Sequence, residues 1–320
     1  MWKTILRRII LMIPQIFLLS VVVFLLGALM PGDALTGLID PTISASQIEA
    51  MRESLGLNKP WPQRYIDWVS NALQGDFGRS WAHRMPVTQI IGQRIMPTIS
   101  LSLLMTIITY LVGLPLGLLA GRYQNSLLER LVNIYNFFTY AIPSFVAGLL
   151  MLWIFGYSLG WFPTRGTVGS GVAPGTLEYF LSRLHHMILP AITIGLLSTT
   201  SIIQYLRTGV VDAKTQDYVR TARSKGVPED KIYSKHIFRN SILPIAQSMG
   251  YTLTGLISGS VITEQIFTYQ GMGQLFISSI TGRDFAVMTT LVLLFGLMTL
   301  FGTLISDIIM IFVDPRIRIR

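Results

Sequence analysis

Few side chains in this sequence have the types and the spacing that catalysis requires. The chain has no cysteine, which excludes disulfides, thiolate metal sites and a cysteine nucleophile. No Gly-Lys-Ser or Gly-Lys-Thr occurs, so the loop and the lysine that hold nucleotide phosphates are absent. A metal site needs three or four converging ligands, and His83, His185 and His186 do not supply one. We therefore predict no catalytic residue, no metal site and no enzyme activity in this chain.

The polar side chains that stand out instead lie in or beside long apolar stretches. A charge in hydrocarbon is costly, so an ionisable group there is a functional suspect by default. Glu264 and Asp307 lie near the ends of such stretches, where each could reach water or an arginine, and this favours a structural role. The side chains that could line a path through a membrane or bridge helices are Asn136, Gln204, Gln247, Ser248 and Glu264.

The elements that must position these groups are membrane-spanning helices. Of the 320 residues, 51% are hydrophobic and 13% are charged, whereas a soluble chain carries about 25% charged residues. A helix needs about 20 apolar residues to cross the hydrocarbon of a bilayer. The stretches that qualify and contain no Lys or Arg are 9–30, 98–120, 131–156, 187–206, 241–263 and 285–313. The sequence thus predicts an all-α membrane protein with about six transmembrane helices.

Positive charge is unevenly distributed among the segments between these stretches. The formal net charge is +9, and Lys and Arg concentrate at both termini, around 122–130 and in 207–240, whereas 31–97 carries as many acidic as basic residues. Basic residues favour the cytoplasmic side, so we expect both termini there and no nucleic-acid partner. The first stretch is too long for a signal peptide and lacks a cleavage site, so we expect a retained anchor.

The long segment after the first stretch contains two expected short helices. Ser46 and Glu49 have capping-box spacing, with Gly56 as a stop, and Pro62 begins a second helix that ends near Gly75. These amphipathic helices suit the membrane interface or an extracytoplasmic partner, and the sequence does not choose between the two. We divide the chain into an N-terminal anchor helix (1–30), an extracytoplasmic segment (31–97), a core transmembrane domain (98–313) and a cytoplasmic tail (314–320).

Small residues recur at helical spacing in two stretches. Gly113, Gly117 and Gly121 share one helical face, and Gly255 and Gly259 repeat the pattern. Such spacing lets two helix backbones approach closely. We favour tight packing inside the chain over a seam with a partner subunit.

The inner segment 207–240 predicts two short helices around a sharp break. The first runs over 215–225, Gly226 stops it where a positive φ is needed, and Pro228 starts the second. A basic helix-glycine-helix element is typical of a docking surface, but the pattern fits a solvated loop equally well.

A family resemblance decides between these two interpretations. The run from Asp217 to Gly226, with Leu243-Pro244 downstream, resembles the coupling-loop signature of ABC importer permeases, and it is most similar to the dipeptide and oligopeptide branch. Arg220-Thr221-Ala222 occupies the Glu-Ala-Ala slot of the wider family. One departure is Gln270, which stands before Gly271-Met272-Gly273 where the branch usually has proline. Further matching motifs are Arg7-Arg8, Pro31-Gly32-Asp33, Leu55-Gly56-Leu57, Gly75-Asp76-Phe77-Gly78, Glu264-Gln265-Ile266-Phe267, Arg283-Asp284 and Val313-Asp314-Pro315-Arg316-Ile317.

The resemblance implies a multi-pass permease in the cytoplasmic membrane of a prokaryote, surrounded by lipid. ATP and Mg would bind two separate cytoplasmic subunits, with no cofactor in this chain. A second homologous permease would complete the pore, and an extracytoplasmic binding protein would deliver peptides. The residues implied at the ATPase contact are Asp217, Tyr218, Arg220, Thr221, Ala222, Lys225 and Gly226.

Two other transport functions remain as alternatives. A nickel permease belongs to the same branch and has similar motifs. A secondary transporter driven by an ion gradient would show charges at midmembrane and often an internal repeat of spans, and neither is visible. An intramembrane enzyme would need catalytic residues that the sequence does not show.

Overall fold

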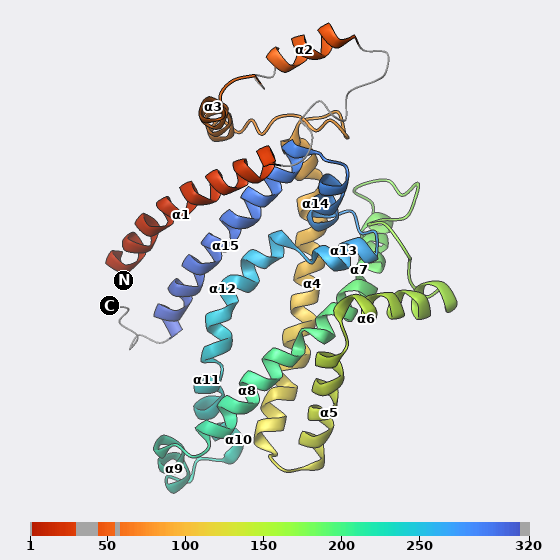
Figure 1. Cartoon of the computed structure of the whole chain (residues 1–320). Coiled ribbons are helices and arrows are strands. Elements are labelled where there is room, and N and C mark those ends of the chain that lie inside the picture. The colour runs from red at the N-terminus through yellow and green to blue at the C-terminus, as the bar shows by residue number, and fades with distance from the viewer. Residues whose placement is uncertain (1, 30–43, 55–57, 314–320) are drawn as a thin grey trace.

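The computed structural model describes residues 2–29, 44–54 and 58–313, and helices dominate them (Figure 1). The predicted tail 314–320 lies outside the described residues. The helices that shape the membrane part are α1 (Trp2–Leu29), α4 (Val87–Arg122), α5 (Leu127–Ala141), α6 (Ser144–Met151), α7 (Leu177–Leu197), α8 (Thr199–Ala213), α12 (Leu243–Ser258) and α15 (Phe285–Val313). Shorter elements are α2 (Ala45–Ser54), α3 (Trp61–Leu73), α9 (Asp217–Ser224), α10 (Glu229–Lys231), α11 (Phe238–Ser241), α13 (Val261–Ile266) and α14 (Met272–Thr281), with π-helical turns over Leu152–Ser158 and Ile232–Ile237.

The all-α membrane class is confirmed, but two of the expected spans are not single straight helices. Four helices in the described part of the chain are long and apolar enough to cross a membrane, and the count is five if a bent pair is one span. The four are Ile5–Leu29, Val87–Arg122, Leu177–Ala213 and Phe285–Met310. The stretch 241–263 instead gives α12, with 16 residues, which ends before Gly259 at φ +67°. A length criterion therefore counts fewer crossings than the six predicted.

The expected span 131–156 is broken by proline. α5 and the helical segment that begins with α6 meet at an angle of 96°. Pro143 has no N–H to continue the helix, and Ile142 before it adopts an extended conformation at φ −82° and ψ 118°. Figure 1 shows α6 leaving the bundle sideways after this turn.

α4 and α8 are joined through the predicted glycine face. A methyl group added at Gly121 would lie 2.6 Å from Cβ of Val210, and one at Gly117 would lie 3.0 Å from Cβ of Leu206. Gly113 faces Ile202 in the same way. The preference for packing within the chain is confirmed for this face.

The two short helices expected in 31–97 form close to where the sequence places them, each with a shifted start. Ser44 and Gln47 form the reciprocal cap of α2, because the Gln47 N–H donates to Ser44 Oγ (3.4 Å) and the Ser44 N–H donates to Gln47 Oε1 (3.0 Å). The prediction of Ser46 as the cap was wrong by two residues. α3 begins at Trp61, one residue before the predicted Pro62, and ends before Gly75, as predicted. Its Tyr65 hydroxyl lies 2.7 Å from Ser20 Oγ of α1.

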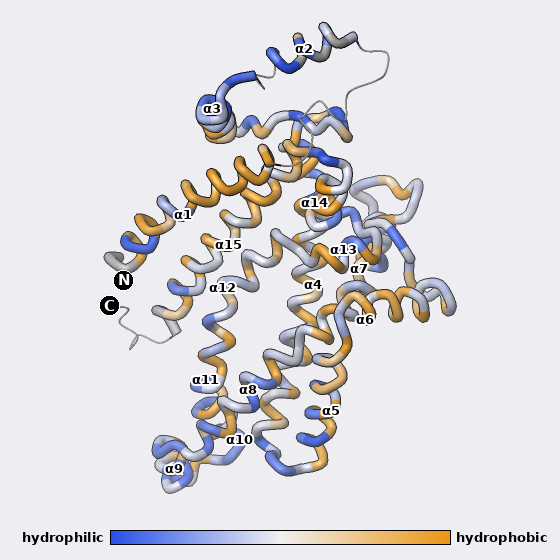
Figure 2. The backbone as a smooth tube through the Cα atoms, in the orientation of Figure 1, coloured by the Kyte–Doolittle hydropathy of each residue, from blue (hydrophilic) through white to orange (hydrophobic). Residues whose placement is uncertain are grey.

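The hydropathy of the elements matches this arrangement. Figure 2 shows hydrophobic residues along most of α1 and much of α6, and mainly hydrophilic residues around α9 and α10. The segment that carries α9 lies past the end of α8, at the same end of the bundle as the turn between α4 and α5 (Figure 1).

Candidate coupling site and membrane path

A tight turn at Gly226 separates α9 from α10. Gly226 has φ +72°, a conformation that suits glycine best because L side chains are strained there. Its N–H donates to the Arg223 carbonyl (2.9 Å), and the Val227 N–H donates to the Ala222 carbonyl (3.2 Å). These two bonds are the Schellman pattern that closes helix C-termini. The predicted helix stop at Gly226 is confirmed.

Ion pairs hold the two sides of this turn together. Arg223 Nε donates to Glu229 Oε1 at 2.7 Å, and Arg223 Nη2 donates to Glu229 Oε2 at 3.3 Å. The Arg223 guanidinium therefore lowers the pKa of the Glu229 carboxyl from its ordinary value. Arg122, at the end of α4, lies 2.7 Å from Asp230 of α10, and its guanidinium carbon lies 4.8 Å from the centre of the Tyr233 ring. The turn is thus tied to a membrane helix as well.

The inner face of α9 is part of the protein core. Val219 is fully buried and Ala222 is 6% exposed. The buried cluster that contains them is Ile202, Leu206, Val210, Ala213, Val219, Ala222, Ile232, Tyr233, Ile237 and Ile245. It joins α9 to α8, α12 and the π-helical turn. Ala222, which the resemblance places at or near the ATPase contact, turns its side chain toward its own chain.

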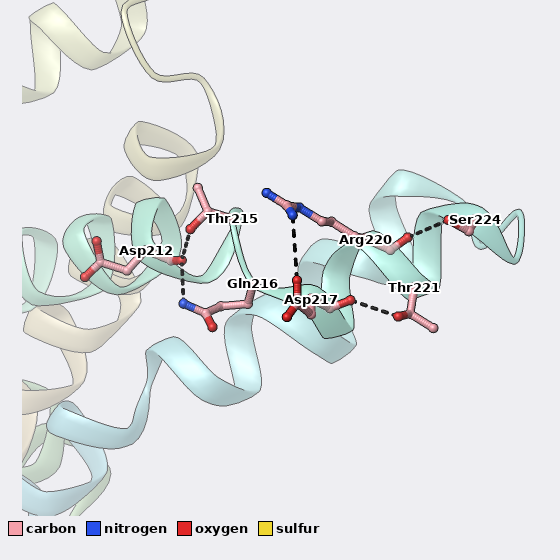
Figure 3. Close-up of polar contacts among 7 residues, drawn as sticks. All are labelled: Asp212, Thr215, Gln216, Asp217, Arg220, Thr221 and Ser224. Atoms are coloured by element: carbon pink, nitrogen blue, oxygen red, sulfur yellow. Dashed lines mark hydrogen bonds and ion pairs between the residues drawn. The ribbon is translucent and has the colours of Figure 1, made fainter.

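The outer face of α9 carries exposed polar groups. Asp217, Arg220, Thr221 and Lys225 are all exposed, and Tyr218 is 39% exposed. Their contacts are local, as Figure 3 shows: the Thr221 hydroxyl donates to the Asp217 carbonyl (2.9 Å), and Arg220 Nη1 lies 3.7 Å from Asp217 Oδ1. Within the described chain, the polar contacts of Asp217, Arg220 and Thr221 stay within α9, whereas Tyr218 also meets the side chain of Asn240 in α11. They form an outward-facing polar surface on a helix that is fixed from behind.

The five predicted path residues do not form one site. Asn136 and Gln204 line a common cavity of about 460 Å³ between α5 and α8. Ser248 lines a different cavity, of about 290 Å³, between α4, α8 and α12. Gln247 is exposed on α12, and its carbonyl accepts a hydrogen bond from the Ser306 hydroxyl.

Glu264 lies apart from both cavities and is completely buried. Its Oε1 accepts from the Thr98 hydroxyl at 2.7 Å, and its Oε2 accepts from the N–H groups of Gly273 (2.7 Å) and Gln274 (3.1 Å). The carboxylate thereby joins α4 to the beginning of α14. This position fits the structural role that the sequence favoured, and no arginine of the described chain hydrogen-bonds the carboxylate.

The sequence reasoning missed the ion pair between Glu129 and Arg207. Glu129 is 4% exposed, and its Oε1 accepts from Arg207 Nε at 2.7 Å, which joins α5 to α8. Ser126 caps α5, since its Oγ accepts from the Glu129 N–H (3.3 Å), and the Glu129 carboxylate accepts from the N–H of Asn125 instead of Ser126, so the capping box is formed only in part. The spacing of Ser126 and Glu129 was the available signal. Asp307, by contrast, pairs with Arg8 at 2.9 Å, as its position suggested.

The histidines are engaged individually. His185 Nε2 lies 2.9 Å from the Trp161 carbonyl oxygen, and His186 Nδ1 lies 2.8 Å from the Ser182 carbonyl oxygen. Among the described residues there is no group of three or more His, Asp or Glu side chains that could hold a metal ion.

Comparison with known proteins identifies the family. Residues 113–319 match the family of binding-protein-dependent transport system inner membrane components, and residues 1–102 match the N-terminal family of the same components. The oligopeptide transport system permease protein AppB of Bacillus subtilis is 36% identical over 98% of both chains. The glutathione transport system permease protein GsiC of Escherichia coli is 32% identical over the full length of both.

A solved structure supports the fold. The inward-facing MetNI methionine ABC transporter matches with a TM-score of 0.54 and 16% identity, covering 71% of this chain and 97% of that chain. Permeases of this kind work with ATPase subunits and a binding protein, and they are multi-pass proteins of the inner membrane. The chain belongs to the binding-protein-dependent transport system inner membrane components, as a permease subunit of an ABC importer.

Proposed function

We propose that the chain is one of two homologous permeases in an importer that moves dipeptides or oligopeptides into the cytoplasm. Two cytoplasmic subunits bind ATP and Mg, an extracytoplasmic binding protein delivers the peptide, and both termini are cytoplasmic. The names of AppB and GsiC, which refer to oligopeptide and glutathione transport, support a peptide cargo over nickel.

One observation carries the coupling role: α9 is exposed on its outer face and held by the protein core on its inner face. Exposed Asp217, Arg220, Thr221 and Lys225 meet a groove of an ATPase subunit, with Tyr218 and Gly226 at its edge. When the ATPases close, they carry α9 with them. The buried cluster transmits this displacement to α8 and α12, so the bundle switches between two packings as rigid bodies.

This chain performs no bond-breaking step in the cycle. Its residues transmit motion and line the path, and the chemistry of ATP hydrolysis belongs to the partner subunits. No cofactor or metal is assigned to the chain.

The turn at Gly226 provides the test of coupling. Open space surrounds a Cβ at this position, so a substitution acts only through the backbone. A β-branched residue at φ +72° costs about 1–2 kcal/mol, whereas asparagine tolerates that conformation better. In proteoliposomes that contain the whole complex, Gly226→Val should lose peptide uptake while ATP hydrolysis continues, and Gly226→Asn should keep both. Normal uptake by the valine variant would refute the docking assignment.

The cargo and the topology need separate measurements. Uptake of labelled di- and tripeptides against uptake of nickel distinguishes the two branch functions. Because the chain has no cysteine, a Thr221→Cys variant can be labelled by a membrane-impermeant thiol reagent. Labelling from the cytoplasmic side is expected, and labelling only from outside would overturn the orientation.

A further inference from the structure

Two cavities flank α8, and their linings satisfy hydrogen bonds in different ways. The cavity beside α4 and α12 is lined by hydroxyls that bond to their own helices: Thr106 donates to the Ser102 carbonyl (2.8 Å), and Ser248 donates to the Ile245 carbonyl (2.8 Å). Such hydroxyls need no further partner, so this surface can face lipid or another helix.

The cavity between α5 and α8 is lined by polar side chains whose hydrogen-bonding groups do not all find partners within the chain. We call it the amide pocket, and its residues are Asn133, Asn136, Phe137, Tyr140, Gln204, Arg207 and Thr208. Their spacing of three and four residues puts them on one face of each helix. Its volume of about 460 Å³ is within the range of ligand pockets, about 300–1,000 Å³.

Asn136, in the wall of this pocket, has a buried acceptor without a partner. The residue is 5% exposed, and no described group hydrogen-bonds its Oδ1. A buried polar atom without a partner costs free energy, so it needs an external donor. The side chains of Asn133 and Gln204 are exposed and also have no hydrogen bond within the described residues.

Arg207 adds a guanidinium to the pocket wall, fixed in place by its ion pair with Glu129. Its Nε and Nη2 both contact Oε1 of buried Glu129, and its side chain is 32% exposed. The ion pair fixes the guanidinium and compensates its charge. The remaining terminal nitrogen, Nη1, has no described partner and can donate to a ligand.

The position of these groups indicates which side of α5 meets water. Both helices belong to apolar membrane segments, and unpaired amides at that depth face either a water-filled cavity or another protein. The opposite side of α5 exposes Leu131, Ile134 and Phe138, which suit lipid. The amide pocket therefore faces the interior of the transport complex.

We propose that the amide pocket is a subsite for peptide main chains inside this permease. The exposed amides of Asn133 and Gln204 pair with the peptide backbone, and Phe137 and Tyr140 contact the peptide side chains. The Asn136 amide turns into the pocket when peptide binds, so that its Oδ1 accepts from a peptide N–H. Every peptide offers alternating N–H and C=O groups, so amide side chains recognise it without selecting its sequence. The lining contains no carboxylate or imidazole, the ligands that a nickel ion would prefer. This inference rests on the proposed peptide function.

Cysteine labelling in the whole complex tests whether the pocket contains water and peptide. Cysteine-free partner subunits complete the background, since this chain has no cysteine. Asn133→Cys and Gln204→Cys should react with a charged, membrane-impermeant thiol reagent in inward-open complexes, and Ile134→Cys, on the opposite side of α5, should not. Trialanine should slow the labelling of the first two at least about fivefold, and backbone N-methylated trialanine should slow it less.

Three outcomes would overturn the subsite. They are equal labelling at Ile134→Cys and Asn133→Cys, no protection by trialanine, and cross-linking of Asn133→Cys to the second permease, which would mean that protein covers the pocket. Transport gives an independent measure. Asn136→Leu should lower trialanine uptake about tenfold, whereas Ser248→Ala in the other cavity should not change uptake.

The two proposals fail in different ways. If the wild-type complex imports no peptide, the proposed function is wrong. If it imports peptide and Asn136→Leu imports it equally well, peptide import stands and the subsite is refuted.

Discussion

Two glycine turns of the permease, named by the proposed orientation, use their polar groups in opposite ways: the inner turn at Gly226, between α9 and α10, and the outer turn at Gly271, between α13 and α14. At the inner turn, Gly226 has open space around it and the polar side chains of α9 point outward. At the outer turn, a methyl group on Gly271 would collide with the Glu264 carboxylate, and both oxygens of that carboxylate are bonded within the chain. The inner turn leaves its hydrogen-bonding capacity for a partner, and the outer turn uses its capacity internally.

The difference shows which contacts stabilise each turn. α9 is stable because Val219 and Ala222 are buried behind it, so its outer side chains can change with little effect on folding. The α13–α14 turn is stable because one buried carboxylate satisfies donors from two elements. Substitutions should therefore act on folding at the outer turn and on coupling at the inner one.

The largest effect on stability is expected at Glu264. Glu264→Ala leaves the Thr98 hydroxyl and the N–H groups of Gly273 and Gln274 without an acceptor in a buried site. Each unsatisfied buried donor costs about 1–3 kcal/mol, so the loss should reach about 3 kcal/mol or more. Thermal unfolding of the purified complex measures it. Glu264→Gln keeps a carbonyl acceptor and should lose less stability. An alanine variant as stable as wild type would show that the hydrogen bonds of Glu264 do not stabilise this turn.

A matched pair of glycine substitutions compares the two turns directly. A Cβ at Gly271 would collide with Glu264 Oε2 and Thr98 Oγ1, which hydrogen bonds hold in place, so Gly271→Ala should cost about 3 kcal/mol. Gly226→Ala meets no atom and carries only the strain of positive φ, about 1 kcal/mol. The same thermal unfolding assay ranks them. Equal losses of stability would show that the outer turn shifts to accommodate the added methyl group.

Acid should loosen the inner turn slightly. The pKa of Glu229 is lowered by Arg223, so their ion pair contributes fully above the ordinary value of 4.5 and is lost as the pH falls through the lowered folded-state pKa. Both side chains are about half exposed, so less than about 1 kcal/mol is involved. Amide hydrogen exchange over 217–231, compared at each pH with Arg223→Gln, measures it. An identical response in the variant would assign the change to another group.

The smallest effect on folding is expected on the outer face of α9. Arg220 has a side chain that is 72% exposed, so Arg220→Glu should change stability by no more than about 0.5 kcal/mol. If α9 docks on an ATPase subunit, co-purification of that subunit and transport-coupled ATP hydrolysis should nevertheless fall. Lys235→Glu, which is exposed but lies outside α9, is the control. Equal losses in both variants would indicate general electrostatics instead of a docked surface.

Local signals predicted the inner turn well because its structure depends on neighbouring residues. Gly226 and Pro228 have strong intrinsic backbone preferences, and the break between α9 and α10 occurs at these residues. The end of α3 followed from the same kind of signal. The cap of α2 failed because Ser44 and Ser46 each have a suitable partner three residues later, and local spacing cannot rank them.

Other features depend on distant contacts that spacing does not reveal. Thr98 bonds Glu264 across 166 positions of the chain, and no local pattern predicts that burial. The amide pocket brings Asn136 and Gln204 together from different helices, although each could be chosen singly as a polar group in an apolar stretch. The bend after Ile142 was visible as a proline, but proline inside α4 and α7 breaks neither helix, so residue type alone does not fix the outcome.

The glycine face between α4 and α8 has a mechanical consequence. Three successive turns of α4 pack closely against α8, so the two helices move together as one rigid body. They cannot separate without opening a void along the contact. A displacement of α9 that reaches α8 is therefore passed to the part of α4 that packs against α8. Bulky replacements at Gly113, Gly117 or Gly121 would therefore change the rate of the transport cycle without contacting nucleotide or cargo.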